Sequence, residues 1–233
     1  MDTNVLTRMR SDWNDRAKEN AQYYVQNSTK DWDQREFFRS GEINVANDVL
    51  GDMPSICGGR RSPLDLNALE IGCGVGRMTR MLARVFGHVT GVDISEEMIS
   101  QAKRNTADWN NVDLIVGDGC TLSGLPDSSY DYAFSYIVFQ HIPSYDVIAS
   151  YCREVFRVLR PGSLFKFQVQ GGTGVVRKSE LDTWLGYPIS LDGAAILAQE
   201  SGFHLEGQTG AGTQYFWLWF RKPGVPATPE SKP

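Results

Sequence analysis

The sequence predicts a doubly wound α/β domain, and three observations indicate it. Residues 66–71 form an apolar run of strand length. Glycines follow at three alternate positions, Gly72, Gly74 and Gly76, and apolar residues then recur at helical spacing. Further short apolar runs alternate with helical patterns as far as residue 221, which is typical of a parallel sheet covered by helices.

The three glycines form a turn that suits a nucleotide. A side chain there would keep a ligand away from the backbone, and the turn must adopt φ values that other residues avoid. The N–H groups at the start of the following helix point into the same gap. Seventeen residues after Gly76, the run 88–92 ends in Asp93, at the tip of a second strand. In a βαβ unit such a carboxylate accepts hydrogen bonds from ribose hydroxyls.

The spacing of the glycines separates two classes of cofactor. A dinucleotide fingerprint requires Gly-x-Gly-x-x-Gly. Counted from Gly72, its third glycine position holds Arg77, and counted from Gly74 it holds Thr79. Glu70 lies two residues before the first glycine, where its charge would repel a pyrophosphate and suit a cationic amino-acid group. The pattern therefore favours a sulfonium nucleoside, and a nicotinamide-dependent oxidoreductase is the rival interpretation.

Four motifs in order resemble those of the class I S-adenosylmethionine-dependent methyltransferases. They are Glu70-x-Gly72-x-Gly74-x-Gly76, Asp93, the run 117–119 after a third strand at 114–116, and the run 130–135 of a fourth strand. The resemblance covers about residues 64–221 and implies S-adenosylmethionine as the cofactor. It also implies a Rossmann-like sheet of seven mostly parallel strands with an antiparallel last strand, preceded by a helical lid.

The resemblance assigns cofactor contacts to individual residues. Glu70 would hold the methionine ammonium directly or through the glycine loop, Asp93 the ribose, and Asp118 the exocyclic amine of adenine. Ile94 and Met98 would flank the adenine ring, although a role in the core suits them nearly as well. The remaining expected cofactor contacts are Gly72, Cys73, Gly74, Gly76, Arg77, Gly119, Cys120 and Tyr136. For the two cysteines, packing as buried thiols is an equally good interpretation.

Three parts of the chain are expected to shape the methyl-acceptor site. The first is a lid of two helices, Val5–Asn20 and Trp32–Asp52, the second is the run 138–143 after the fourth strand, and the third is the stretch 175–188. The candidate substrate contacts are Trp13, Tyr23, Tyr24, Gln140 and Trp184. The alternative for the lid aromatics is that they only pack the helices against the sheet.

His141 lies near the expected acceptor site and is the candidate general base. A base contributes most when the acceptor is a hydroxyl. The alternative is a histidine that stabilises a turn or contacts the cofactor. The chain has no Asn/Asp-Pro-Pro-Tyr motif and no Pro-Cys nucleophile, which argues against the methyltransferases that act on adenine, glutamine amides or the cytosine ring carbon.

The chain divides into a helical lid at 1–62, a methyltransferase-like domain at 63–222 and a disordered tail at 223–233. Within the domain, a helix at 146–160 is expected to end at Pro161-Gly162. A strand at 164–170, a helix at 190–201 and two final strands at 203–206 and 214–221 follow.

Composition limits the possible partners. The 233 residues carry a net charge of −5, which argues against a large nucleic-acid footprint. No run of 18 apolar residues exists, so no contact with a membrane is expected, and the N-terminus lacks a signal-peptide pattern, so the expected location is the cytoplasm. Four scattered cysteines and three histidines predict no metal site. A monomer or a homodimer is expected.

The predicted function is transfer of a methyl group from S-adenosylmethionine to an oxygen or nitrogen of a small molecule. A protein methyltransferase and a non-catalytic module that binds S-adenosylmethionine are the alternatives.

Overall fold

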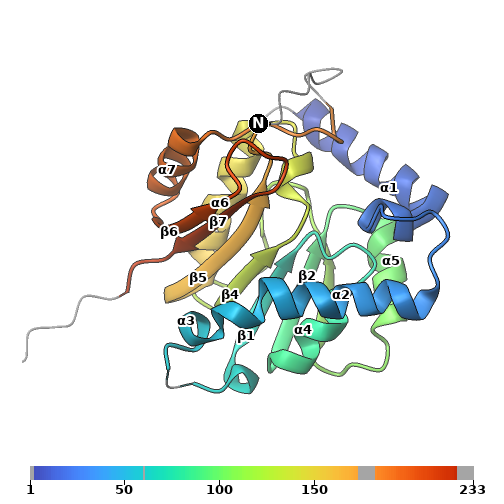
Figure 1. Cartoon of the computed structure of the whole chain (residues 1–233), viewed down its shortest axis with the longest axis horizontal. Helices are drawn as coiled ribbons and strands as arrows, with labels where there is room; N and C mark the ends of the chain where they lie inside the picture. Colours follow the sequence, from blue (N-terminus) through green and yellow to red (C-terminus); the bar gives the residue numbers. More distant parts are fainter. Residues whose placement is uncertain (1–2, 60, 173–181, 225–233) are drawn as a thin grey trace, which may run out of the picture.

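The computed structural model describes residues 3–59, 61–172 and 182–224, in which seven strands form one sheet (Figure 1). The strands are β1 (Asn67–Ile71), β2 (His88–Asp93), β3 (Val112–Val116), β4 (Tyr130–Ser135), β5 (Leu159–Val169), β6 (His204–Thr209) and β7 (Phe216–Arg221). Their order across the sheet is β3-β2-β1-β4-β5-β7-β6. β7 is antiparallel to both of its neighbours, whereas the other pairs are parallel. This confirms the predicted doubly wound sheet with an antiparallel last strand.

The central strand β1 determines where a ligand can bind. It pairs with β2 on one side and with β4 on the other, so the chain reverses its direction of winding there. Ligands of open α/β sheets bind beyond the carboxyl ends of the strands at such a switch point. The glycine loop follows β1, and Asp93 is the last residue of β2. Both therefore lie at this edge of the sheet.

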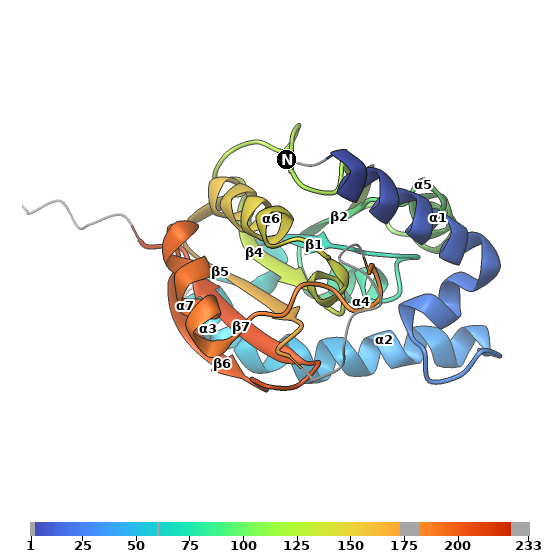
Figure 2. The same ribbon diagram turned by 90° about the horizontal axis from the view of Figure 1, so that it is seen from above.

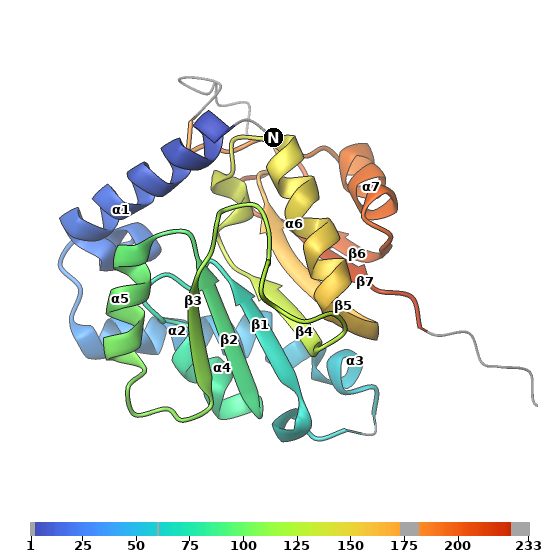
Figure 3. The ribbon, with the colours of Figure 1, turned by 180° about the vertical axis from the view of Figure 1, so that it is seen from behind.

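Helices cover both faces of the sheet. They are α1 (Thr3–Val25), α2 (Gln34–Asp48), α3 (Met53–Cys57), α4 (Thr79–Val85), α5 (Glu96–Asn105), α6 (Tyr145–Val158) and α7 (Leu191–Glu200), and 3-10 turns occur at Leu50–Asp52, Pro63–Asp65 and Phe139–His141. Apolar side chains of α2, α3 and α4 pack on one face in a cluster with Phe134. Those of α6 and α7 pack on the other face with Phe165 and Phe167. Figure 2 shows α2 and α6 on opposite sides of the sheet, and Figure 3 shows α6 in front of it.

The first helix, α1, lies across the carboxyl edge and is tied down on two sides. Towards α5, Asn14 Oδ1 accepts hydrogen bonds from Ser95 Oγ at 2.7 Å and from the Glu97 backbone N–H at 3.2 Å. Towards the segment after residue 181, Asp12 accepts from the Thr183 hydroxyl at 2.7 Å. The helix therefore covers the end of the sheet where the predicted lid should lie.

Several element boundaries differ from the sequence prediction, including those of the second lid helix, since α2 spans Gln34–Asp48 rather than Trp32–Asp52. α1 continues to Val25 across a kink at Asn20, whose φ and ψ are −164° and 84°. The helix α6 ends at Val158 rather than at Pro161-Gly162, because β5 begins at Leu159 and contains both residues. A register shift between β4 and β5 accommodates this start, and proline is tolerated in a strand at such an irregularity. The short helix α3 was not predicted.

Two predicted features lie wholly or partly outside the described residues. They are the tail, of which residues 225–233 are not described, and the cover of the acceptor site, of which residues 175–181 are not described. Among the described helices, none has both the length and the apolarity that crossing a bilayer requires.

Candidate active site

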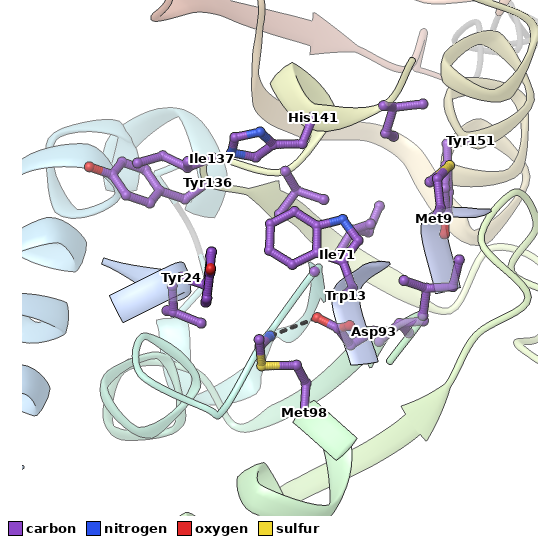
Figure 4. A pocket seen from close by; sticks show the side chains of 17 residues that line it. Met9, Trp13, Tyr24, Ile71, Asp93, Met98, Tyr136, Ile137, His141 and Tyr151 are labelled. Atoms are coloured by element: carbon purple, nitrogen blue, oxygen red, sulfur yellow. Dashed lines mark hydrogen bonds between the residues drawn. The ribbon is translucent and has the colours of Figure 1, made fainter. Parts of the chain in front are cut away.

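A cavity of about 700 Å³, partly open to solvent, lies at the carboxyl edge of the sheet (Figure 4). α1 forms one wall, and the glycine loop, the end of β2, the start of α5 and the segment after β4 form the others. Its lining includes Met9, Trp13, Tyr24, Val25, Gly72, Gly74, Asp93, Ile94, Met98, Tyr136, Ile137, His141 and Tyr151. We call it the main cavity.

The glycine loop borders the main cavity because side chains could not be accommodated there. Gly72 and Gly74 have φ angles of +73° and +53°, in the left-handed region. A Cβ atom on Gly72 would lie 2.2 Å from the Val138 side chain, and one on Gly74 would lie 2.9 Å from Val25 of α1. The loop is thus closely covered by the segment after β4 and by the end of α1.

Asp93 is tied to the glycine loop by a direct hydrogen bond. Its Oδ2 accepts from the Gly74 backbone N–H at 2.9 Å, drawn dashed in Figure 4, and its Oδ1 accepts from the Ser95 backbone N–H at 2.9 Å. Burial raises the pKa of Asp93 to about 6, although these hydrogen bonds oppose the rise. Since each carboxylate oxygen has a further lone pair, Asp93 can still accept from a ligand hydroxyl in the main cavity.

Asp118 lies beside this site but does not line the main cavity. Its carboxylate accepts from the backbone N–H groups of Cys120 at 2.9 Å and Thr121 at 2.7 Å, and from the Thr121 hydroxyl. Burial would raise the pKa of Asp118, but these hydrogen bonds hold it below its usual value. Burial, followed by the charges of Asp118 and Asp93, raises the pKa of the Tyr151 phenol, so both carboxylates lie near one side chain of the cavity wall.

Glu70 and Arg77 support the glycine loop from the opposite face of the sheet. Glu70 accepts from the Thr79 hydroxyl at 2.5 Å, and burial raises its pKa to about 8 despite the nearby Arg77. Arg77 donates to Asn44 at 2.7 Å and to Ser40 at 3.1 Å. Because neither side chain lines the main cavity, the geometry does not favour direct contact of Glu70 or Arg77 with a cofactor there.

The remaining predicted cofactor contacts divide into two groups. Ile94, Met98 and Tyr136 line the main cavity. Cys73, Gly119 and Cys120 do not, and Gly76 packs against α5 instead. The Cys73 side chain packs against Gly91, and the Ile94 side chain covers Gly119. Packing therefore explains why Cys73 and Gly119 do not line the main cavity.

A second, narrower cavity, which we call the acceptor chamber, adjoins the main cavity. The two share Tyr24, Val25, Ile137 and His141, and the chamber adds Gln140, Trp184 and Tyr215 among its walls. Of the predicted substrate contacts, the structure brings Tyr24, Gln140 and Trp184 together in the chamber, and it places Trp13 in the main cavity. Tyr23 lines neither cavity, and its ring contacts Tyr24 and the Lys30 ammonium.

His141 lies at the junction of the two cavities and is held as a neutral imidazole. Its Nδ1 donates to the Trp184 carbonyl at 2.7 Å, since a carbonyl can only accept. The rings of Trp13 and Trp184 lie 5.4 and 5.1 Å from the imidazole, measured between centroids. Burial lowers the pKa of His141 to about 4, and the charge of Arg16 lowers it further, whereas the Trp184 carbonyl opposes the change. Nε2 is therefore a hydrogen-bond acceptor and a weak base.

The backbone conformation of one residue that lines both cavities could not be predicted from the sequence. Ile137, shared by both cavities, has a φ angle of +55°. A β-branched residue in this region is strained, and such strain concentrates at functional sites. β4 ends at Ser135, two residues before this position. No local sequence signal marks this conformation, whereas the spacing of Met9 and Trp13, one turn apart on α1, could have indicated a shared face.

Comparisons with known proteins show which class this domain is similar to. Residues 69–167 match the family model described as "methyltransferase domain". This match, which covers less than half of the chain, and the sheet order together confirm the predicted resemblance to the class I methyltransferases and the fold predicted from it.

Individual relatives agree with this class. The demethylmenaquinone methyltransferase of Listeria welshimeri is 38% identical over 101 residues, which are 41% of this chain and 41% of the relative. The match thus spans about two fifths of the length of this curated relative. Phosphoethanolamine N-methyltransferase 1 of Haemonchus contortus, solved with phosphoethanolamine and S-adenosylhomocysteine, has a TM-score of 0.68 at 15% identity and covers 100% of this chain and 52% of its own. Magnesium protoporphyrin IX methyltransferase of Synechocystis, with bound S-adenosylhomocysteine, has a TM-score of 0.66 at 17% identity and covers 94% and 99%. These two likenesses concern the fold.

Proposed function

We propose that this protein transfers a methyl group from S-adenosylmethionine to a small molecule. The single observation that carries the proposal is the joined pair of cavities at the carboxyl edge of the sheet. One is bordered by the glycine loop and a buried carboxylate, and the other by aromatic side chains. A nucleoside in the first would place its reactive end beside an acceptor in the second.

The residues that line the main cavity fit the proposed cofactor. Asp93 offers lone pairs to ribose hydroxyls, and Ile94 and Met98 offer apolar contacts to a purine ring. Asp118 would serve the adenine amine only if its carboxylate gave up part of its bonding to Thr121. Glu70 would act on the methionine ammonium through the glycine loop rather than directly, because its carboxyl pairs with Thr79.

Catalysis by this chain would rest mainly on alignment. The bound cofactor supplies an electrophilic methyl group on a sulfonium, which transfers by in-line displacement. Holding two reactants in line contributes about 7–11 kcal/mol. His141 can accept a hydrogen bond from the acceptor molecule and orient it, but a buried imidazole with a pKa of about 4 is poorly suited to the predicted role of general base.

A small-molecule acceptor fits the chamber better than a protein. The chamber is enclosed by α1, by the segment after β4 and by residues 184 and 215, and it shares walls with the main cavity. These walls suit a compact ligand. An oxygen and a nitrogen nucleophile both remain compatible with the proposal, and so do a monomer and a homodimer in the cytoplasm.

Titration with S-adenosylhomocysteine tests the proposal. Wild-type protein should bind it, and Asp93→Asn should weaken binding about 10- to 100-fold, because a hydrogen bond to a charged group is worth about 1.5–3 kcal/mol. Asp108→Asn, which changes an exposed aspartate on the surface, is the matched control and should bind as wild type. Tight binding of NAD without binding of S-adenosylhomocysteine would refute the proposal. Labelled methyl transfer to a panel of small hydroxyls, amines and thiols then separates an enzyme from a non-catalytic module.

A further inference from the structure

The acceptor chamber contains a polar atom that the proposed function leaves unused. Gln140 is 2% exposed and lines the chamber. Within residues 3–59, 61–172 and 182–224, no donor reaches its Oε1. Gln168 and Gln170 are also buried with an unpaired Oε1, but neither lines the main cavity or the chamber. Gln140 is thus distinguished from the other two glutamines by its place in the wall of the chamber.

The neighbouring histidine fixes which end of the Gln140 amide is unpaired. Because Nδ1 of His141 donates to the Trp184 carbonyl, Nε2 of the neutral ring can only accept. The amide nitrogen of Gln140 faces this Nε2 at 3.4 Å, which is a weak donor–acceptor contact. The reverse orientation of the amide would bring two acceptors together. The network therefore leaves Oε1 as an acceptor that lacks a donor.

The backbone around Gln140 is held rigidly. The Gln140 carbonyl accepts from the Gly186 backbone N–H at 2.8 Å, and a Cβ on Gly186 would lie 2.7 Å from that carbonyl oxygen. Three residues earlier, Ile137 is strained at positive φ. The side chain of Gln140 therefore extends from a fixed backbone in the wall of the chamber.

The walls of the chamber indicate the shape and charge of its ligand. The rings of Tyr24 and Trp184 meet edge to face, with centroids 6.0 Å apart. The Arg16 guanidinium lies 5.4 Å from the Trp184 centroid and 6.0 Å from that of Tyr24, so a cation already accompanies these rings. A flat, uncharged molecule suits such walls better than an ammonium.

We propose that the acceptor chamber selects a flat, uncharged molecule through a hydrogen-bond donor, an O–H or N–H group, that pairs with Gln140 Oε1 beside Nε2 of His141. The proposal rests on the proposed function and adds the class of the acceptor molecule. An analogue without the donor would leave the buried oxygen unpaired, and sites of this kind reject such analogues.

The test compares two probes with the same ring system, 2-naphthol, which has an O–H donor, and 2-methoxynaphthalene, in which a methyl group replaces the hydroxyl hydrogen. Binding of each is measured by calorimetry to wild-type protein saturated with S-adenosylhomocysteine. 2-Naphthol is expected to bind about tenfold more tightly than its ether. Gln140→Leu should abolish this preference. Gln168→Leu, which makes the same change at an equally buried glutamine outside the chamber, should keep it.

Equal affinities of wild-type protein for the two probes, or no binding of either, would overturn the proposal without the need for any variant. So would a preference that survives in Gln140→Leu. The affinity of each variant for S-adenosylhomocysteine shows that it is folded. Failure of wild-type protein to bind S-adenosylhomocysteine would instead refute the proposed function.

Discussion

Replacement of Glu70 by glutamine should remove a pH dependence from the stability of the free protein. Glu70 is 4% exposed, and within the described ranges the only hydrogen bond to its side chain comes from the Thr79 hydroxyl. Burial raises its pKa from 4.5 to about 8. Between these values the unfolded chain carries an ionised Glu70, whereas the folded chain holds a proton on it. The folded state then binds more protons, so stability falls as pH rises.

The size of the effect follows from the pKa of Glu70. Each pKa unit corresponds to about 1.4 kcal/mol, so raising the pH from 6 to 8 should cost wild-type protein about 2–3 kcal/mol of unfolding free energy. Asp93 and His141 partly offset each other in this window: the raised pKa of Asp93, about 6, costs about 0.4 kcal/mol between pH 6 and 8, whereas the lowered pKa of His141, about 4, returns about 0.8 kcal/mol. Glu70→Gln keeps an oxygen for Thr79 and has no proton to lose, so its stability should be nearly constant.

Urea unfolding at pH 6, 7 and 8, followed by tryptophan fluorescence, measures this difference. Glu36→Gln is the matched control, since it changes an exposed carboxylate in the first turn of α2 and should leave the wild-type slope intact. A flat wild-type profile, or a Glu70→Gln profile that falls as steeply as that of wild type, would show that the buried carboxyl is not held protonated.

Three further predictions concern packing and ligand binding. Gly41→Ala should cost about 1–3 kcal/mol of stability in urea unfolding, because its Cβ would lie 2.3 Å from the Arg77 carbonyl oxygen, whereas Gly51→Ala, with open space around it, should be near neutral. Gly74→Ala should weaken S-adenosylhomocysteine binding in calorimetry at least tenfold, since the loop sits at a φ of +53° under the end of α1, and unchanged affinity would contradict the role of the loop. Affinity for S-adenosylhomocysteine should fall as the pH is lowered from 7 to 5, because Asp93 takes up a proton near pH 6, and the Asp93→Asn variant should lack this dependence.

Features that depend on residues close together in the chain could be predicted from the sequence. Glycine spacing predicted the turn, and the carboxylate that ends the run 88–93 predicted its partner, which the structure joins by the bond from Gly74 to Asp93. Ser95 was readable as a helix cap because its side chain serves residues three positions ahead, and it does accept from the Met98 N–H. Strand alternation could also have shown that Glu70, between Leu69 and Ile71, faces away from the side those two residues share.

Features that depend on contacts between distant segments of the chain could not be predicted from the sequence. The environment of His141 is set by Trp184, which is 43 residues away in the chain and fixes both its tautomer and its burial. The early start of β5 depends on its pairing with β4. The positive φ angle of Ile137 could not be predicted from its residue type, because isoleucine by itself favours the extended region.

Residues of α1 line both cavities, and this bears on how the substrate preference can change during evolution. The segment shared with the family, residues 69–167, contains the glycine loop and Asp93. Trp13 and Tyr24 come from α1, and Trp184 follows the segment, so all three lie outside it. Under the proposed function, changes in these flanking parts can therefore alter which acceptor molecule binds, while the segment proposed to bind the nucleoside stays the same.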